Sequence, residues 1–205
     1  MTLNVVAIDG PVGSGKSTVA RELARELGWS FLDTGAMYRA VTVAARRRGI
    51  DVHDEGALGD LAESVTVETL PNVTVDGVGV DGELRTPETN QAVSIVAAQA
   101  RVRAAMVRQQ RLFAERQAVG TVVEGRDITT VVFPDARLKI FLTASLDERT
   151  RRRGDEDAAS VARRDEIDAN RDVSPLRQSD DAKMVDTTGR TVHDVVEEIL
   201  TWLRT

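Results

Sequence analysis

Short apolar runs without polar alternation mark the predicted strands of the chain. Residues 4–8 (NVVAI) form one such run, and two more follow at residues 121–124 and 138–143. A strand that is apolar on both faces belongs in a parallel sheet with helices on either side. Shorter runs at residues 29–32 and 184–186 extend the pattern. The hydrophobic pattern therefore predicts an α/β fold built on a parallel sheet.

Helices are predicted between these strands. Val19, Leu23 and Leu27 recur at every fourth position, which predicts a helix over residues 17–27 that Gly28 ends. Thr191 opens the last helix, with Asp194 three residues later as in a capping box. Apolar positions predict two more helical stretches, over residues 34–49 and over residues 87–118 with a break near residues 99–101.

Two segments depart from this pattern. Between residues 65 and 81, valines alternate with polar residues around the turn sequences Pro71–Asn72 and Asp76–Gly77. The alternation predicts a small antiparallel hairpin or meander inserted into the parallel fold. Residues 146–171 are almost entirely charged and favour a helix, and they offer few apolar positions. Because such a segment buries little surface, we expect an exposed, mobile arm.

Composition narrows the chemistry. The 205 residues, with 41% hydrophobic and 29% charged side chains, suit a globular domain. A net charge of −6 argues against nucleic-acid binding, which needs a basic face. The absence of cysteine excludes disulfides, thiolate nucleophiles and cysteine-ligated zinc, and two histidines are too few for a multi-histidine metal site. We expect no signal peptide, no membrane span and a cytoplasmic protein.

The strongest motif lies directly after the first predicted strand. The sequence GPVGSGKS at residues 10–17 matches G-x-x-x-x-G-K-[ST] and opens a predicted helix, which is the context that a phosphate-binding loop requires. Its glycines let backbone N–H groups turn inward, and the helix adds its positive dipole end. Lys16 supplies a charge for the β- and γ-phosphates, and Ser17 a hydroxyl for Mg²⁺. The motif indicates binding of a nucleoside triphosphate; a glycine-rich turn without a ligand is the alternative.

Other candidate residues follow the second predicted strand. In a parallel sheet the ligand crevice lies beyond the carboxyl ends of the strands. Asp33, Thr34, Tyr38 and Arg39 therefore lie near that crevice, and the last three fall within about one helical turn of each other. The alternative is a helix N-cap, a packing tyrosine and a surface arginine.

The sequence EGRD at residues 124–127 ends another strand. Gly125 permits a close backbone approach, Arg126 offers a clamp for a phosphate, and Asp127 accepts hydrogen bonds from a base or sugar. The alternative is a turn with one surface ion pair.

The charged arm holds two further groups of candidates. Arg164, Asp168 and Arg171 share a helical face, which is either a ligand-binding face or a solvated row of ion pairs. The arginines before them either lie in solvent or close over the phosphates of ATP; they are Arg149, Arg151, Arg152 and Arg153.

Five motifs together resemble the bacterial cytidylate kinases, in the order seen in that family. They are GPVGSGKST at residues 10–18, LDTGAMYR at 32–39, GELRTPE at 82–88, EGRDITTVVFPDA at 124–136 and RRDEIDANRDVSPL at 163–176. The phosphate-binding loop is shared by many families, whereas the second and fourth motifs are far more specific. The resemblance spans nearly the whole chain.

The resemblance implies a nucleoside monophosphate (NMP) kinase fold. A five-stranded parallel sheet flanked by helices would form a core at roughly residues 1–60, 118–147 and 172–205. An NMP-binding insertion, with antiparallel strands and helices, would cover roughly residues 61–117, and a short helical lid roughly residues 148–171.

The resemblance also implies which residues bind the nucleotides. Cytosine is read by Thr34, Arg103 and Asp127, the ribose lies near Ser94, Arg164 and Asp168, and Arg39, Arg126 and Arg171 surround the acceptor phosphate. Tyr38 and Gly125 complete the CMP site. ATP is held by Gly10, Pro11, Val12, Gly13, Ser14, Gly15, Lys16, Ser17 and Thr18, with the lid residues Arg149, Arg152 and Arg153. Thr34 stands where some members have serine, Ile167 interrupts a more polar run, and the arm at residues 154–161 looks short.

The resulting hypothesis is transfer of the γ-phosphoryl group of ATP to CMP or dCMP. Lys16, Arg39, Arg126 and Arg171 are the predicted catalytic residues. Mg²⁺ is expected on Ser17, with Asp33 or Glu124 orienting its water ligands. A kinase for another nucleotide or a small metabolite is the nearest alternative, and a nucleotide-switched binding module a more distant one. With no obvious apolar face for assembly, we expect a monomer.

Overall fold

The computed structural model describes residues 3–154, 157–170 and 173–204. The chain divides into two compact units. The first comprises residues 1–32 and 114–205, and the second comprises residues 33–113. Arg171, one of the predicted site residues, lies outside the described residues.

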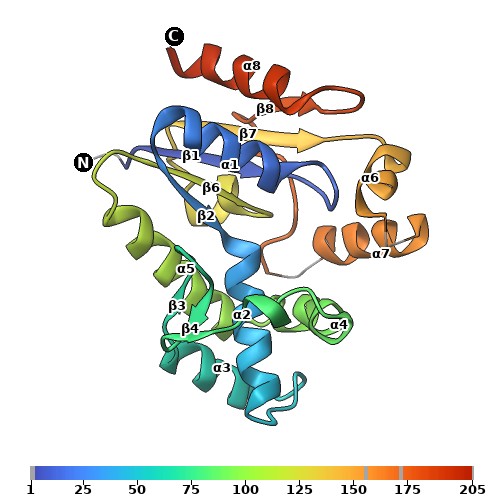
Figure 1. Ribbon diagram of the computed structural model, residues 1–205. Coiled ribbons are helices and arrows are strands. Elements are labelled where there is room, and N and C mark those ends of the chain that lie inside the picture. The colour runs from blue at the N-terminus through green and yellow to red at the C-terminus, as the bar shows by residue number, and fades with distance from the viewer. Residues whose placement is uncertain (1–2, 155–156, 171–172, 205) are drawn as a thin grey trace. The chain divides into compact units, whose positions relative to one another are not determined.

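A five-stranded parallel sheet forms the centre of the first unit (Figure 1). Asp9, at the end of its middle strand, is level with Gly125 on one neighbour and with Phe141 on the other. The carboxyl ends of these strands therefore meet at one edge, where parallel sheets bind ligands. In spatial order the strands are β2 (Ser30–Asp33), β6 (Thr121–Gly125), β1 (Val5–Asp9), β7 (Leu138–Thr143) and β8 (Lys183–Asp186).

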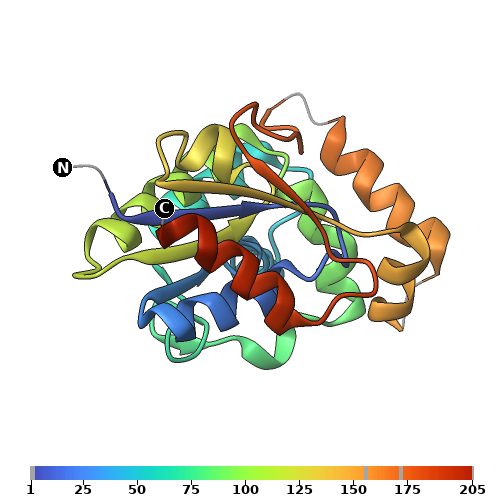
Figure 2. The same ribbon diagram turned by 90° about the horizontal axis from the view of Figure 1, so that it is seen from above.

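Helices α1 (Lys16–Leu27) and α8 (Val192–Arg204) pack against this sheet, and Figure 2 shows them side by side. Their apolar residues enclose one core with the strands, in which Ile8, Leu23 and Ile199 are fully buried. The capping box predicted for the last helix is present, since the amide of Asp194 donates to the hydroxyl of Thr191 at 3.2 Å. The predicted α/β fold is thus confirmed.

The charged arm forms helices α6 (Leu146–Arg153) and α7 (Ala158–Ala169), which contact each other. Helix α6 buries no residue, as the sequence predicted. The expectation of exposure is wrong for Val161 and Asp168 of α7, which are 0% and 5% exposed. Val161 is an apolar side chain and Asp168 is paired with Arg126, so both can be buried on one face of α7. The mobility of the arm stays a prediction.

The second unit contains a three-stranded antiparallel sheet and four helices. The strands confirm the predicted meander, with Val67 level with Val75 and Thr74 level with Gly79. The strands are β3 (Val67–Glu68), β4 (Thr74–Val75) and β5 (Val78–Gly79), and the helices are α2 (Thr34–Arg47), α3 (Glu55–Ser64), α4 (Pro87–Val96) and α5 (Ala100–Glu115). A short 3-10 helix covers Asp81–Glu83. Helix α2 contacts α3, α4, β3 and β4, so it is the axis of this unit.

Besides this 3-10 helix, two elements were not predicted. Helix α3 has Asp54 as its N-cap, whose carboxylate accepts the amide of Ala57 at 2.9 Å. In the first unit, a π-helical turn covers Ile128–Val132, just after β6. Among the helices that the structure describes, none combines the length and the apolar character that a membrane crossing demands.

Candidate active site

The glycine-rich loop joins β1 to α1 and packs closely against its surroundings. Gly13 has φ of 76°, and a Cβ atom there would lie 2.8 Å from the carbonyl oxygen of Arg149. A Cβ atom on Gly10 would lie 2.1 Å from the carbonyl oxygen of Leu142. Both positions therefore exclude a side chain, as the motif predicts.

Lys16, at the start of α1, is buried. Its Nζ donates to the carbonyl oxygen of Pro11 at 2.7 Å. Burial lowers the pKa of Lys16 to about 7, and the charge of Arg126 adds to this shift, while nearby carboxylates including Glu124 oppose it. A bound phosphate would reverse the shift, because an anion favours the charged amine. The protonation state of Lys16 therefore depends on whether the loop has bound a phosphate.

Ser17 and Glu124 connect α1 to the end of β6. The hydroxyl of Ser17 donates to Oε1 of Glu124 at 2.6 Å, and Glu124 is 4% exposed. A hydroxyl and a carboxylate are oxygen ligands of the kind that Mg²⁺ prefers, and Mg²⁺ usually completes its shell with water and phosphate oxygens. The described residues contain no group of three or more acidic or histidine side chains that would hold a metal without such ligands. These two residues fit a magnesium site that forms together with a nucleotide.

Two arginines of α6 bind the backbone of the phosphate loop. Arg149 donates to the carbonyl oxygen of Val12 at 3.1 Å. Arg152 donates to Oγ1 of Thr187 at 2.9 Å and to the carbonyl oxygen of Gly13 at 3.4 Å. The hydroxyl of Thr187 donates in turn toward the carbonyl oxygens of Ser14 and Thr143. Two of the three arginines predicted to contact ATP thus bind carbonyl oxygens of the phosphate loop. Arg153, the third, ends α6.

The EGRD sequence crosses from β6 into the next turn. The guanidinium Nε of Arg126 lies 2.7 Å from Oδ2 of Asp168 on α7. Burial works against the charge of Arg126, but the carboxylate of Asp168, together with Glu124 and Asp165, outweighs burial and the pKa of Arg126 is raised. Asp127 follows and is 4% exposed. Arg164 lies one helical turn before Asp168, half-buried. The structure therefore joins two of the predicted acceptor-site motifs at one ion pair.

Asp9 supports this turn and was not singled out from the sequence. Its carboxylate accepts the amides of Ile128 at 2.9 Å and Thr129 at 2.7 Å, and the Thr129 hydroxyl at 2.7 Å. Burial raises the pKa of Asp9 to about 6, and these hydrogen bonds oppose the shift. An acidic residue that ends an otherwise apolar strand was the signal in the sequence, since a buried carboxylate needs several donors.

The second unit holds five of the predicted site residues on three helices. The guanidinium of Arg103 on α5 lies 5.4 Å from the ring centre of Tyr38 on α2, within the range of a cation–π contact. Arg39 donates to the carbonyl oxygen of Gly35 at 3.3 Å. Thr34 is 3% exposed, and Ser94 on α4 is half-buried. The structure thus brings together Tyr38 and Arg103, which are 65 positions apart in the sequence.

The N-cap of α2 is Asp33. Its Oδ1 accepts the amide of Ala36 at 2.9 Å. Thr34, the residue that the alternative interpretation placed at the cap, is instead the first residue of the helix. Capping occupies one oxygen of Asp33, whereas Glu124 already contacts the serine of the motif. Of the two carboxylates predicted to orient the waters of Mg²⁺, Glu124 is the better placed.

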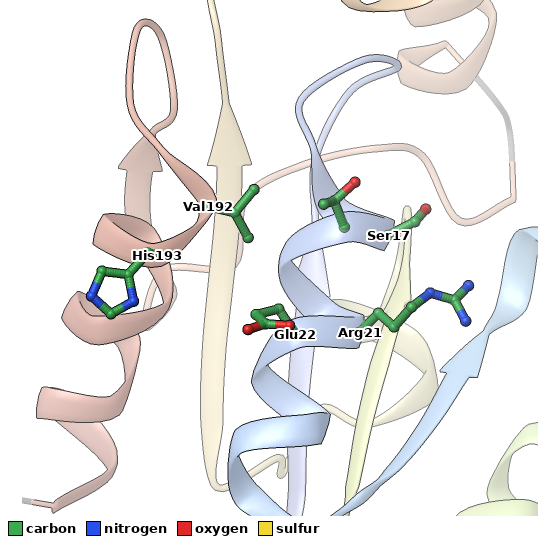
Figure 3. A pocket seen from close by; sticks show the side chains of 6 residues that line it. Ser17, Arg21, Glu22, Val192 and His193 are labelled. Carbon is green, nitrogen blue, oxygen red and sulfur yellow. The ribbon is translucent and has the colours of Figure 1, made fainter.

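A groove of about 580 Å³ lies beside the phosphate loop, between α1 and α8. It is lined by Ser17, Thr18, Arg21 and Glu22 of α1 and by Val192 and His193 of α8. Figure 3 shows Glu22 on the side of α1 that faces α8, with Arg21 directed away from α8. The groove includes Ser17 and Thr18 of the motif and extends along α1 toward α8.

Known proteins match over both units. The family model for cytidylate kinases matches residues 6–205. The cytidylate kinase of Desulforamulus reducens is 45% identical and covers 97% of this chain and 96% of its own length. That of Mycobacterium leprae is 47% identical and covers 98% of this chain and 95% of its own length. Among solved structures, a gluconokinase from Sinorhizobium meliloti covers 98% of this chain and 91% of its own, with a TM-score of 0.54 at 14% identity, a likeness of fold.

Proposed function

Because the chain belongs to the cytidylate kinase family, as its motifs predicted, we propose that it transfers the γ-phosphoryl group of ATP to CMP and dCMP. The products are ADP and the nucleoside diphosphate. One observation carries this proposal. The hydroxyl of Ser17 in the donor loop donates to Oε1 of Glu124 at 2.6 Å, and Arg126 follows two residues later in the acceptor motif. This contact between the donor loop and the acceptor motif supports transfer between two nucleotides held side by side.

Catalysis by this site is positioning and charge neutralisation. The 5′-phosphate of CMP has its second pKa near 6, so at pH 7 it is mostly ionised and needs no strong general base. The transferring phosphoryl group carries its charge on three oxygens. Lys16 and Arg126 neutralise that charge from the donor and acceptor sides, and we assign the same task to Arg39 and Arg171.

We place Mg²⁺ at Ser17, with Glu124 holding one of its water ligands and Asp33 as the second choice. The bound ion neutralises charge on the phosphate oxygens of ATP. Ser17 and Glu124 would orient the ion, because the hydrogen bond between them fixes both oxygen atoms beside the phosphate loop.

The remaining assignments keep the roles that the family resemblance implies. For ATP they are the backbone of residues 10–18, with Arg149, Arg152 and Arg153. For CMP they are Thr34, Arg103 and Asp127 at the base, Ser94, Arg164 and Asp168 at the ribose, Arg39, Arg126 and Arg171 at the phosphate, and Tyr38 and Gly125 around them. The division into core, NMP-binding insertion and lid, the cytoplasmic location and the monomeric state remain predictions.

The experiment compares acceptors. Purified protein is incubated with ATP, Mg²⁺ and each of CMP, dCMP, UMP, AMP and GMP, and ADP release is followed. We expect CMP and dCMP to give the highest kcat/KM, because a wrong base leaves buried polar groups of the site unpaired. Equal rates with AMP or GMP would contradict the proposal and favour a kinase for another nucleotide.

A variant separates the two phosphate sites. Arg126→Ala should raise the KM for CMP at least tenfold and leave ATP affinity within about threefold. Arg108→Ala is the matched control, since Arg108 is an exposed arginine on α5. Equal losses for CMP and ATP would assign Arg126 to the donor phosphates instead.

A further inference from the structure

Helix α7 carries two carboxylates on one face, each bound to a different part of the active site. Asp165 and Asp168 are three residues apart, so they point to the same side of the helix. Asp168 pairs with Arg126 at 2.7 Å, at the acceptor motif. Asp165 pairs with Arg149, at the donor loop. Neither nucleotide role implied for the family uses Asp165.

Asp165 binds the backbone of the phosphate loop directly. The amide of Val12 donates to Oδ1 of Asp165 at 3.1 Å, while the carbonyl oxygen of Val12 accepts from Arg149 at 3.1 Å. Asp165 and Arg149 therefore bind both backbone polar groups of Val12, its amide N–H and its carbonyl oxygen. The side chains of Asp165 and Arg149 are 21% and 11% exposed, so the surrounding protein strengthens these charged contacts.

Apolar packing contributes little to the placement of α7. Val161 is the only buried apolar residue among residues 158–169. The described polar contacts of α7 include Asp165 on the loop, and Asp168 on Arg126 and, through its carbonyl oxygen, on the amide of Leu176 at 2.7 Å. Loss of one polar anchor therefore shifts the helix more easily than it would in an apolar interface.

We propose that Asp165 is a positioning residue: it holds α7 on the phosphate loop and so places Asp168 and Arg126 for the acceptor nucleotide. The inference rests on the proposed function, because it concerns the same acceptor site. Asp165 touches no substrate in this role. Asp165 thereby couples the donor site to the acceptor site. The phosphate loop that binds ATP also anchors α7, and α7 orients the residues that bind CMP.

The first test compares the KM for CMP with the KM for ATP. Asp165→Ala should raise the KM for CMP at least tenfold, although the described contacts of Asp165 are with Val12 of the donor loop and with Arg149. Asp165→Asn keeps an acceptor for the Val12 amide but loses the ion pair, so it should give an intermediate increase. Glu166→Gln, the neighbouring exposed residue on the same helix, should leave both KM values unchanged. A rise in the KM for ATP alone would overturn the proposal.

A double-mutant cycle checks the route through Asp168. In an Asp168→Ala background the link to Arg126 is already lost, so Asp165→Ala should raise the KM for CMP by less than threefold. Independent effects that multiply in the double variant would overturn the proposal. Thermal melting of each variant checks the fold, and Asp165→Asn carries the test if Asp165→Ala unfolds.

The two proposals fail in different experiments. The wild-type acceptor panel alone decides the proposed function. If another acceptor wins that panel, the same variants are assayed with that acceptor, and an unchanged KM for it in Asp165→Ala overturns the positioning role.

Discussion

Ser17 and Glu124 lie 107 positions apart in the chain and share a hydrogen bond of 2.6 Å between Oγ and Oε1. Ser17 belongs to the phosphate loop, and Glu124 is the second-last residue of the neighbouring strand β6. The parallel pairing of β1 with β6 brings the two residues together, since Asp9 is level with Gly125. The sheet register thus provides two oxygen ligands from separate motifs at one place.

Replacing Glu124 should therefore weaken the use of Mg²⁺. Glu124→Gln removes the charge but keeps the size, and outer-shell ligands of this type contribute about 10–100-fold to metal affinity or activity. We expect the Mg²⁺ concentration for half-maximal activity to rise by roughly tenfold or more. A magnesium titration of the kinase rate measures this. Glu26→Gln, an exposed glutamate on α1, is the control. An unchanged Mg²⁺ requirement would exclude Glu124 from the metal site.

Binding of ATP should be accompanied by proton uptake at Lys16. With a pKa of about 7, this amine is largely neutral at pH 8.5 when no ligand is bound, and triphosphate favours its charged form. We expect about one proton to be taken up at pH 8.5 and almost none at pH 5.5, where the amine is already charged. Calorimetry in two buffers of different ionisation enthalpy counts the protons.

Lys16→Arg is the control for this count, because arginine stays charged at both pH values. Proton uptake should disappear in that variant. Identical binding enthalpies of the wild type in both buffers at pH 8.5 would show that Lys16 is charged before ATP arrives.

Removing the carboxylate of Asp9 should destabilise the protein. Asp9→Ala leaves two buried amides and a hydroxyl without their acceptor, and each such loss costs about 1–3 kcal/mol. Because the variant no longer buries a carboxylate, part of this loss is offset, and we expect the free energy of unfolding at pH 7 to fall by roughly 2–5 kcal/mol. Urea unfolding measures it, with the exposed Asp135→Ala as the control. A loss no larger than the control's would mean that water replaces the carboxylate.

The same comparison has a pH dependence with a definite sign. Burial raises the pKa of Asp9 from 3.8 to about 6, so the folded state binds this proton more tightly than the unfolded state. The stability that Asp9 contributes is therefore largest below pH 3.8 and decreases as the pH rises through 6. The difference between wild type and Asp9→Ala should be greater at pH 4 than at pH 7, and the opposite order would contradict the shift.

Two glycines with similar φ should differ in their tolerance of alanine. Gly13 and Gly28 have φ of 76° and 64°, so alanine costs roughly 1–2 kcal/mol of backbone strain at each. At Gly13 the new Cβ also meets the backbone of Arg149, whereas nothing lies within 4 Å at Gly28. Gly13→Ala should therefore impair ATP binding and lower the melting temperature further than Gly28→Ala. Equal melting temperatures and ATP affinities would contradict the close packing at the loop.

The elements with strong local patterns were predictable from sequence. The two-sided apolar runs identified the buried strands, and β7 has the predicted bounds at residues 138–143. Helix α3 was missed because Gly56 and Gly59 lower its helix propensity, although Asp54 is an ordinary N-cap signal. Its apolar positions at Leu58 and Leu61 are too few to outweigh the glycines.

Contacts between distant segments were beyond local patterns. The π-helical turn after Asp127 depends on Asp9, which is about 120 positions earlier in the chain. Asp165 was not singled out from the sequence, because only the fold brings it to Val12. The phosphate loop and Arg126, by contrast, were recognisable because they combine residue types that phosphate recognition requires. Asp168 was a candidate because it shares a helical face with two arginines.

The ion pair between Arg126 and Asp168 has a consequence for how tightly nucleotides bind. In the proposed role of Arg126, an incoming phosphate meets a guanidinium that already pairs with the carboxylate of Asp168. The electrostatic gain of phosphate binding is then the difference between two strong attractions, so a simple anion would gain little by binding there. A nucleotide would bind more tightly than a simple anion, because its base and sugar add contacts that the anion lacks.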